Sequence, residues 1–462
     1  DVKEHEGGVF RGVVENGTIR EVTSEEITAD ILDSGDEKGY VRSGKASVPG
    51  IPGVGFYAKA DATPATDPYK ISIADKLGEM MAEQLSNAYT NSAGTQASIS
   101  SISTSVFANS SNKVLDINSS ITFSFSSSLL TDGTTTISDS TGVLPYVEQA
   151  ISRYPRLCCL FTLVSLYVTG ATASLTVYSP VEASKLYSVT LQYENALDDI
   201  LKVPNSNTNM SPVEKLLYLH DEVVSLTEYS YRSNLYAIDY VPAGTVIYNT
   251  SVCQSYAAVF NHLARRQGVV SYVLDSDTHA WNVVQVGGAW YYIDTTWDDS
   301  SVSGEDKINH YYFMVAKSAF SSGHELDDFY SSAFSGIDNS FGSAYDSYLP
   351  KVSSSGTTSN ITSQMGYMGG YFYYAKDNVM YRWNGTGSAQ AMTTVTEAAN
   401  RRVNVCDGTV YISGADGLYS CNQTMTQASK LSVTSYTGMH EAAGVLYVSE
   451  GGSPREVPHH RV

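Results

Sequence analysis

Positive charge is scarce in this sequence. Lysine and arginine together number 28 against 48 aspartate and glutamate residues, which gives a formal net charge of −20. Nucleic acids and anionic membranes attract positive charge, so this balance argues against either of them as the main partner. Positively charged or neutral polymers remain compatible with it.

A long apolar run is also missing. A membrane-spanning helix needs about 20 consecutive apolar residues, and no stretch reaches that length, so we expect no membrane span. The chain begins with Asp1 rather than methionine, which fits a processed N-terminus whose signal peptide has been removed. Only 16% of the residues are charged, while 34 tyrosines and many small polar residues supply the surface. This balance is typical of bacterial extracellular proteins and predicts a secreted or cell-surface location.

Cysteine is rare, and its number is odd. The five cysteines leave at least one thiol unpaired unless two molecules are linked. Cys158 and Cys159 lie in an apolar run and are predicted to be buried, because a free cysteine behaves as a small apolar residue. Cys406 and Cys421 either form a disulfide across neighbouring strands or remain free, and Cys253 stands alone.

Metal-binding motifs are missing too. No HExxH sequence occurs, and His310 and His324 lack metal-ligand spacing with any third residue. We therefore predict no metal site and no other cofactor.

The chain is long enough for two to four domains, each with its own core. Changes in composition and in apolar periodicity divide it into four regions. These are a β-rich leader or stalk at 1–70, an α/β domain at 71–205, a central domain at 206–350 and a β-repeat domain at 351–462.

The central region opens with a well-marked helix at 211–227. Ser211, Pro212 and Glu214 supply the cap, the first-turn proline and the third-position acid of a capping box. His220 lies on the apolar stripe of this helix, and we favour a hydrogen-bonded core histidine there over a catalytic one.

A second helix is predicted to carry a cysteine in its first turn. Ser251 and Gln254 repeat the capping-box pattern around Cys253, apolar residues recur every three or four positions, and Gly268 ends the helix. The positive end of a helix lowers the pKa of a cysteine, and its free N–H groups can receive a developing oxyanion. A cysteine that merely fills space between helix and sheet is an equal alternative for this residue taken alone.

Two strands flank Gly287 and Gly288, which predicts a hairpin with a two-residue turn. Counted outward from that turn, His279 opposes Thr296, and Asp294 becomes the diagonal neighbour of His279 on the same face. A bulge of one residue would turn Asp294 to the other face. If the register has no bulge, the imidazole of His279 and the carboxylate of Asp294 can contact each other.

These residues form a candidate catalytic triad. Cys253 would be the nucleophile, His279 the base that takes and returns its proton, and Asp294 the group that orients the ring. Trp281, Trp290 and Trp297 crowd the same hairpin, where core packing explains them as well as substrate contact does.

The segments VCQSYA, HAWNVV and YYIDTTWDD resemble the cysteine, histidine and aspartate motifs of the transglutaminase-like superfamily, the bacterial branch of papain-like thiol enzymes. The motifs occur in the order of that family, and the helix with LHDEVV resembles the one before its cysteine. The similarity covers about residues 205 to 320 well. Ser255 is a departure, since a glycine usually follows the cysteine and glutamine in that family.

This resemblance implies an α+β fold in which a cysteine helix packs on an antiparallel sheet. It assigns the triad to Cys253, His279 and Asp294. It implies an enzyme, a peptidase or an acyltransferase, that acts on amide bonds of a protein or peptide substrate, cell-wall-associated substrates included. Candidates for oxyanion or substrate contacts are Gln254, Trp281, Asn282 and Trp297. The sequence leaves the substrate and the oligomeric state open.

The C-terminal region repeats itself. Units that begin at Gly370, Gly408 and Gly444 align, with Tyr373 of the first matching Tyr411 of the second. Each unit predicts a β-hairpin, and such units stack because one alone cannot bury its face. We favour tyrosines that pack the repeat over tyrosines that bind a polymer. The rival functions are a non-catalytic scaffold that keeps the fold, or a β-repeat adhesin that binds polymer through residues 360–452.

Overall fold

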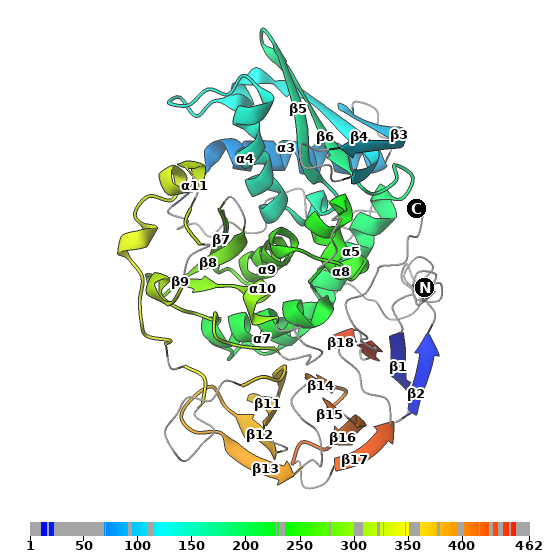
Figure 1. The fold of residues 1–462 in the computed structure, drawn as a ribbon, viewed down its shortest axis with the longest axis vertical. Helices are drawn as coiled ribbons and strands as arrows, with labels where there is room; N and C mark the ends of the chain where they lie inside the picture. Colours follow the sequence, from blue (N-terminus) through cyan, green and yellow to red (C-terminus); the bar gives the residue numbers. More distant parts are fainter. Residues whose placement is uncertain are drawn as a thin grey trace.

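Figure 1 shows the fold of the protein in a computed structural model. The structure describes residues 11–15, 18–22, 69, 71–90, 95–108, 114–227, 229–230, 236–276, 279–299, 308–320, 324–326, 328–346, 348–350, 361–376, 379–394, 402–414, 416–424, 428–432, 438–442 and 445–449.

The first large region places helices against an antiparallel sheet. The sheet has the strand order β3-β4-β6-β5, and helix α4 contacts both α3 and the cysteine helix of the central region. Its elements are α3 (Ser72–Tyr89), β3 (Ala97–Ala108), β4 (Val114–Ser126), α4 (Ser140–Arg153), β5 (Phe161–Thr169), β6 (Thr172–Ser179), α5 (Leu186–Ile200) and α6 (Lys202–Ser206).

The central region packs helices on a second antiparallel sheet, of order β7-β8-β9. Helix α9 lies against β7 and β8, and α7 lies on the far side of α9 from α4 (Figure 1). The elements are α7 (Pro212–Leu226), α8 (Pro242–Ile247), α9 (Cys253–Arg266), β7 (Val270–Asp275), β8 (Ala280–Val286), β9 (Ala289–Ile293), α10 (Thr295–Asp298) and α11 (Asp328–Ala333).

Helix α7 begins as its sequence predicts. The Ser211 hydroxyl accepts from the Glu214 N–H, and the Glu214 carboxylate accepts from the Ser211 N–H, with Pro212 as the first helical residue. This capping box confirms the predicted start of the helix.

Helix α9 begins one residue later than predicted. Its N-cap is Val252 rather than Ser251, and the hydroxyl of Ser255 accepts from the Val252 N–H. Ser255 is fully buried, and it also donates to the backbone oxygen of Asp239. The serine that departs from the family pattern therefore fastens the start of the helix, and Cys253 becomes its first residue.

The hairpin register agrees with the prediction. Val286 opposes Ala289 across the two-residue turn, and Asn282 opposes Ile293 without a bulge. Gly287 and Gly288 have φ values of 59° and 84°, the left-handed pair that such a turn requires. The pairing stops at Ile293, however, because the chain then enters α10, so the predicted pair of His279 with Thr296 does not form.

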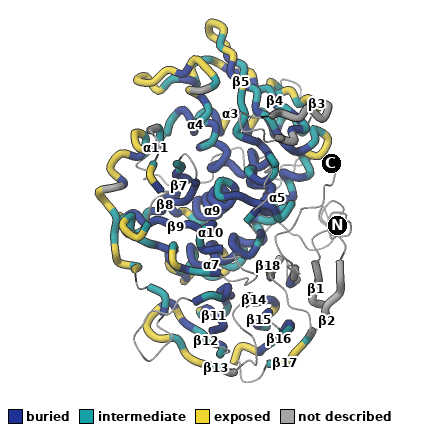
Figure 2. Tube along the Cα trace, viewed as in Figure 1, coloured by how far each residue is buried: buried dark blue, intermediate teal, exposed yellow. Residues whose placement is uncertain are grey.

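One hydrophobic core joins the first large region, the central region and the start of the C-terminal region. Its buried side chains extend from Ile73 to Trp383, and Figure 2 shows dense burial along α9 and α7. The site described below is thus held from both sides by packed elements. The domain limits proposed from the sequence, including the one at residue 205, remain predictions.

The described C-terminal strands form three four-stranded antiparallel sheets. The first two are β10-β11-β12-β13 and β14-β15-β16-β17, and the third is completed by two N-terminal strands in the order β18-β19-β1-β2. The strands are β1 (Arg11–Glu15), β2 (Thr18–Val22), β10 (Gly366–Met368), β11 (Tyr371–Lys376), β12 (Val379–Trp383), β13 (Gln390–Thr394), β14 (Arg402–Cys406), β15 (Thr409–Gly414), β16 (Gly417–Cys421), β17 (Ala428–Ser432), β18 (Gly438–Ala442) and β19 (Val445–Ser449).

The pairing of β1 with β19 brings the two ends of the sequence together, as Figure 1 shows at the lower right. Because a hairpin cannot bury its face alone, the third repeat gains a partner from the start of the chain. The tyrosine positions agree with packing: Tyr373, Tyr374 and Tyr419 are buried.

Cys406 and Cys421 are both free and buried, so the disulfide that the sequence left open is absent. Strand β15 lies between the strands that carry them, and two strand spacings amount to about 9.6 Å. Cys158 and Cys159 are buried in the main core, as predicted.

The apolar run HYYFMV at 310–315 predicts a last strand of the central region, and this prediction is wrong. Residues 310–315 make one isolated bridge, between Tyr292 and Val315, and Met314 has a φ of 55° that interrupts an extended path. No helix in the described ranges combines the length and apolar character that crossing a membrane requires.

Candidate functional site

Cys253 lies at the first position of α9, half-buried, with its side chain against Val273 and Ala280 of the sheet. The first backbone N–H groups of a helix have no partner within it, so they and the helix dipole favour negative charge at this point. The other four cysteines are buried. Position and accessibility therefore single out this thiol.

His279 and Asp294 lie in direct contact. His279 Nε2 donates to Asp294 Oδ2 at 2.6 Å. His279 immediately precedes β8 and Asp294 immediately follows β9, so both lie at the open end of the hairpin. His279 is 8% exposed and Asp294 is 1% exposed. Because Nε2 is engaged with the carboxylate, Nδ1 is the ring nitrogen left to face the Cys253 thiol.

Asp294 is held by the element that it caps. Its Oδ1 accepts from the N–H groups of Thr296 and Trp297, each at 3.0 Å, which makes it the N-cap of α10. Burial acts to raise the pKa of Asp294, but hydrogen bonds from His279 and His324 outweigh burial and hold its pKa below the usual value. The carboxylate is therefore ionised and fixed in orientation.

The environment of His279 favours its protonated form. Burial acts to lower the pKa of the ring, while hydrogen bonds with Asp294 and with Cys253, and the charges of both groups, raise that pKa to about 10. A ring held between a carboxylate and a thiol can carry a proton from one reacting group to another.

His324 is a member of the site that the sequence did not predict. Its Nε2 donates to the same Asp294 Oδ2 at 2.9 Å, and burial lowers the pKa of its ring. Phe320, Trp297 and Trp281 surround this ring edge-on, with centroids at 4.0, 4.3 and 4.7 Å. No motif marks a histidine 30 residues from its partner, so only the fold reveals the contact.

The predicted oxyanion and substrate candidates divide into two groups. Trp281 and Asn282 are buried: Trp281 stacks under His279 with centroids 6.0 Å apart, and Asn282 Nδ2 donates to the Ala257 oxygen at 2.9 Å. Gln254 and Trp297 are half-buried, and the Trp297 ring lies 5.3 Å from that of His279. The second pair lies where a bound substrate could reach it.

A small hollow of about 20 Å³ lies beside Gln254. Helix α4 forms one wall with Glu148, Gln149 and Ser152, and β7 contributes Asp275. Tyr240 lines the same hollow, and its pKa is raised by burial and by the nearby charges of Cys253 and Asp239. The hollow therefore lies beside the residue that follows the candidate nucleophile in α9.

Among the residues that the structure describes, two groups of side chains have ligand atoms close enough to hold a metal ion, and they include His310 and His324, for which the sequence shows no ligand spacing. One is His220, Asp221 and His310. The other is the Asp294 group with both of its histidines, whose atoms lie within 4.8 Å of one another. In the part of the chain that the structure describes, Nδ1 of His324 has no hydrogen-bond partner, unlike the second nitrogens of metal-bound histidines. The predicted absence of a metal site stays a prediction.

No family model matches this sequence, and no curated protein matches it. Among solved structures, a crystal structure of a TGase is similar to part of the chain, with 14% sequence identity and a TM-score of 0.19 over 38% of this chain and 50% of that one. The chain spans about half the length of that protein. A similarity of this size carries no argument, so function is inferred from the site.

Proposed function

We propose that this protein is a thiol enzyme that acts on amide bonds through Cys253, His279 and Asp294. The observation that carries this proposal is the position of the His279 ring, with Nε2 on Asp294 at 2.6 Å and the thiol of Cys253 as its other neighbour. A histidine oriented by a carboxylate and paired with a thiol at a helix start is the arrangement that thiol acyl transfer needs.

The first step forms an acyl thioester. The Cys253 thiol gives its proton to His279 and its sulfur attacks the carbonyl carbon of the amide, so that the new oxyanion lies at the N–H groups of the first turn of α9. The C–N bond then breaks while protonated His279 donates its proton to the leaving amine. Asp294 stabilises the positive ring and holds it in line.

The second step decides the product. When water attacks the thioester, His279 takes its proton, the C–S bond breaks and a carboxylic acid leaves, which is proteolysis. When an amine attacks instead, the same bond changes yield a new amide, which is protein cross-linking. Both outcomes belong to the proposal, as does a secreted or surface location, which rests on composition.

The small hollow beside Gln254 is lined in part by the acidic side chains Glu148 and Asp275, which favour a substrate with positive or neutral groups on that side of the cysteine helix. Trp297 offers a partly exposed aromatic face on the other side of His279.

Labelling with iodoacetamide followed by peptide mass spectrometry tests the nucleophile. We expect modification of the native protein at Cys253 alone, because the other cysteines are buried, and none in Cys253→Ala. Cys421→Ala is the matched control, since it removes a buried thiol and should leave labelling unchanged. Labelling of Cys253→Ala at the wild-type rate would refute the assignment.

Incubation with peptide acceptors and amine donors, read by mass spectrometry, tests the reaction. Covalent adducts indicate transfer, and cleaved peptides indicate proteolysis; both should vanish in Cys253→Ala. If a library of both kinds gives no Cys253-dependent product although the thiol is reactive, the protein is a scaffold that keeps the site without turnover.

A further inference from the structure

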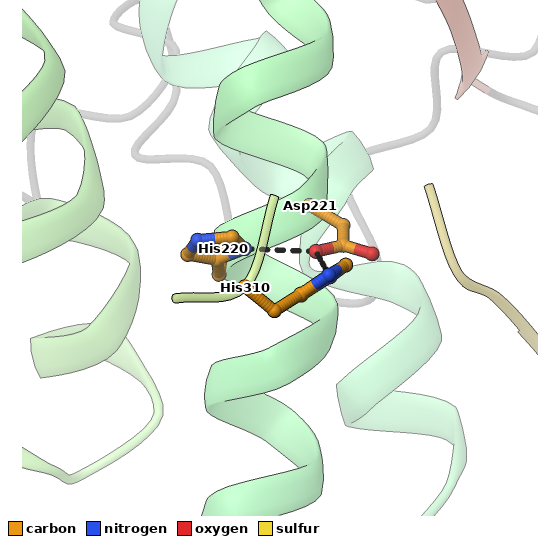
Figure 3. A group of neighbouring side chains, drawn as sticks. All are labelled: His220, Asp221 and His310. Carbon is orange, nitrogen blue, oxygen red and sulfur yellow. Dashed lines mark hydrogen bonds and ion pairs between the residues drawn. The ribbon is translucent and has the colours of Figure 1, made fainter. Parts of the chain in front are cut away.

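A second cluster of titratable side chains lies in the core, away from Cys253. His220 and Asp221 project from the middle of α7, and His310 comes from the segment after α10 (Figure 3). The side chains of all three are fully buried. His220 Nδ1 and His310 Nε2 both lie 2.8 Å from one oxygen, Asp221 Oδ1.

The polar atoms of the three side chains that face away from the centre of the cluster all have hydrogen-bond partners. His220 Nε2 donates to Asp298 Oδ2 at 3.1 Å, and His310 Nδ1 donates to the Ile361 oxygen at 2.6 Å. Asp221 Oδ2 accepts from the Met365 N–H at 2.6 Å. Metal-bound histidines almost always donate their second N–H to a carboxylate or a carbonyl, and metal-bound carboxylates are hydrogen-bonded in turn.

The three remaining polar atoms, His220 Nδ1, His310 Nε2 and Asp221 Oδ1, point toward one another. Two ring nitrogens and one carboxylate oxygen converge on a single point, and the two rings lie with centroids 5.3 Å apart in the interior. The three ligand atoms all lie within 4.8 Å of one another. A divalent ion at this point would be held by two neutral imidazoles and one carboxylate, the forms in which these side chains bind metals.

We propose that His220 Nδ1, Asp221 Oδ1 and His310 Nε2 bind a divalent transition metal ion of the zinc class. Two imidazoles and one carboxylate suit zinc rather than calcium or magnesium, which prefer oxygen ligands. Ligand atoms around tetrahedral zinc lie about 3.3 Å apart, so the contacts among the three ligand atoms open by about half an ångström on binding.

The ion would join three parts of the molecule. Its ligands come from α7 and from the His310 segment, and Ile361 and Met365 link it to the start of the first C-terminal sheet. Next to it, buried Glu222 accepts from Gln364 and Asn404, which strengthens the same junction. The site is therefore structural, and it differs from the Asp294 group, where a thiol competes for one histidine.

Metal content is the direct test. The full chain, made without a histidine tag, is saturated with zinc chloride, passed through gel filtration and measured by inductively coupled plasma mass spectrometry. We expect about one zinc per chain, a loss of that zinc in His310→Gln and Asp221→Asn, and zinc affinity lowered about 10- to 100-fold in Asp298→Asn, which removes an outer partner.

The control is His262→Gln. His262 is equally buried and hydrogen-bonded at both nitrogens, to Tyr193 and to the Ile151 oxygen, but no carboxylate faces it. This variant and Cys253→Ala should keep the zinc, so the result does not depend on the proposed reaction.

A second measurement uses the wild type alone. Dipicolinate should lower the melting temperature of the zinc-loaded protein, and added zinc should restore it, because an ion bound only by the folded state stabilises that state. Wild-type protein with no retained zinc and no response to dipicolinate would overturn the proposal, as would unchanged zinc in folded His310→Gln.

Discussion

Asp294 and Asp298 lie at the two ends of α10, joined by a hydrogen bond from the Asp298 N–H to the Asp294 oxygen, and each holds a different histidine. The first orients His279 beside the candidate nucleophile, and the second accepts from His220 in the core. One short helix therefore links the candidate site to the junction with the C-terminal sheets. Four predictions follow from the contacts around these and other buried charges.

Asp294→Asn is expected to lower turnover by on the order of 10³- to 10⁴-fold, the cost of losing the carboxylate that orients a catalytic histidine. The amide oxygen can still cap α10, so the fold should persist. Rates measured on any substrate identified above, with circular dichroism as the control for folding, check this. Turnover within tenfold of wild type would remove Asp294 from the mechanism.

Folding stability should depend on pH through His279. The contacts of His279 raise its pKa in the folded state to about 10. These contacts therefore add fully to the free energy of unfolding below the unfolded-state pKa of about 6.5. That contribution is lost as pH rises through about 10. The melting-temperature difference between wild type and His279→Gln should therefore be largest near pH 6 and vanish by about pH 11. A difference that stays constant over that range would contradict the assignment.

His324→Phe is expected to shift that pH dependence upward. The substitution removes a donor from Asp294 Oδ2, which makes the carboxylate a stronger acceptor for His279 and raises the pKa of that ring further. Phenylalanine keeps the packing against Phe320 and Trp297. The pH profile of turnover is the measurement: an alkaline limb that moves upward supports a positioning role, and an unmoved limb with lower stability indicates packing alone.

Glu194→Gln should destabilise the fold by about 3–5 kcal/mol, because it leaves the Arg156 guanidinium buried without its counter-charge. The two side chains form a bidentate pair at 2.7 and 2.9 Å, and each is 1% exposed. Urea denaturation gives the free energy of unfolding.

The double variant Arg156→Met/Glu194→Leu is the control, and it should recover most of that loss since neither charge remains. Equal loss in both variants would mean that shape rather than charge decides the stability at this position.

Local patterns in the sequence determined the elements that hold the candidate triad. The capping box of α7, the ending of α9 at Gly268 and the register set by Gly287 and Gly288 all follow from contacts within a few residues. Such contacts depend on backbone geometry and nearest neighbours, so the sequence alone predicts them. The start of α9 was misplaced by one residue because the Ser255 hydroxyl replaced the expected cap.

Only the tertiary structure decided which distant residues share a site. His324 reaches Asp294, His310 reaches Asp221, and β1 pairs with β19 across almost the whole chain. None of these contacts has a periodic pattern, because each forms when separate segments pack onto a common core and bring together whichever side chains then face one another. The cysteine helix and the hairpin can thus be predicted from neighbouring residues, whereas the side chains around the histidines depend on how distant segments pack.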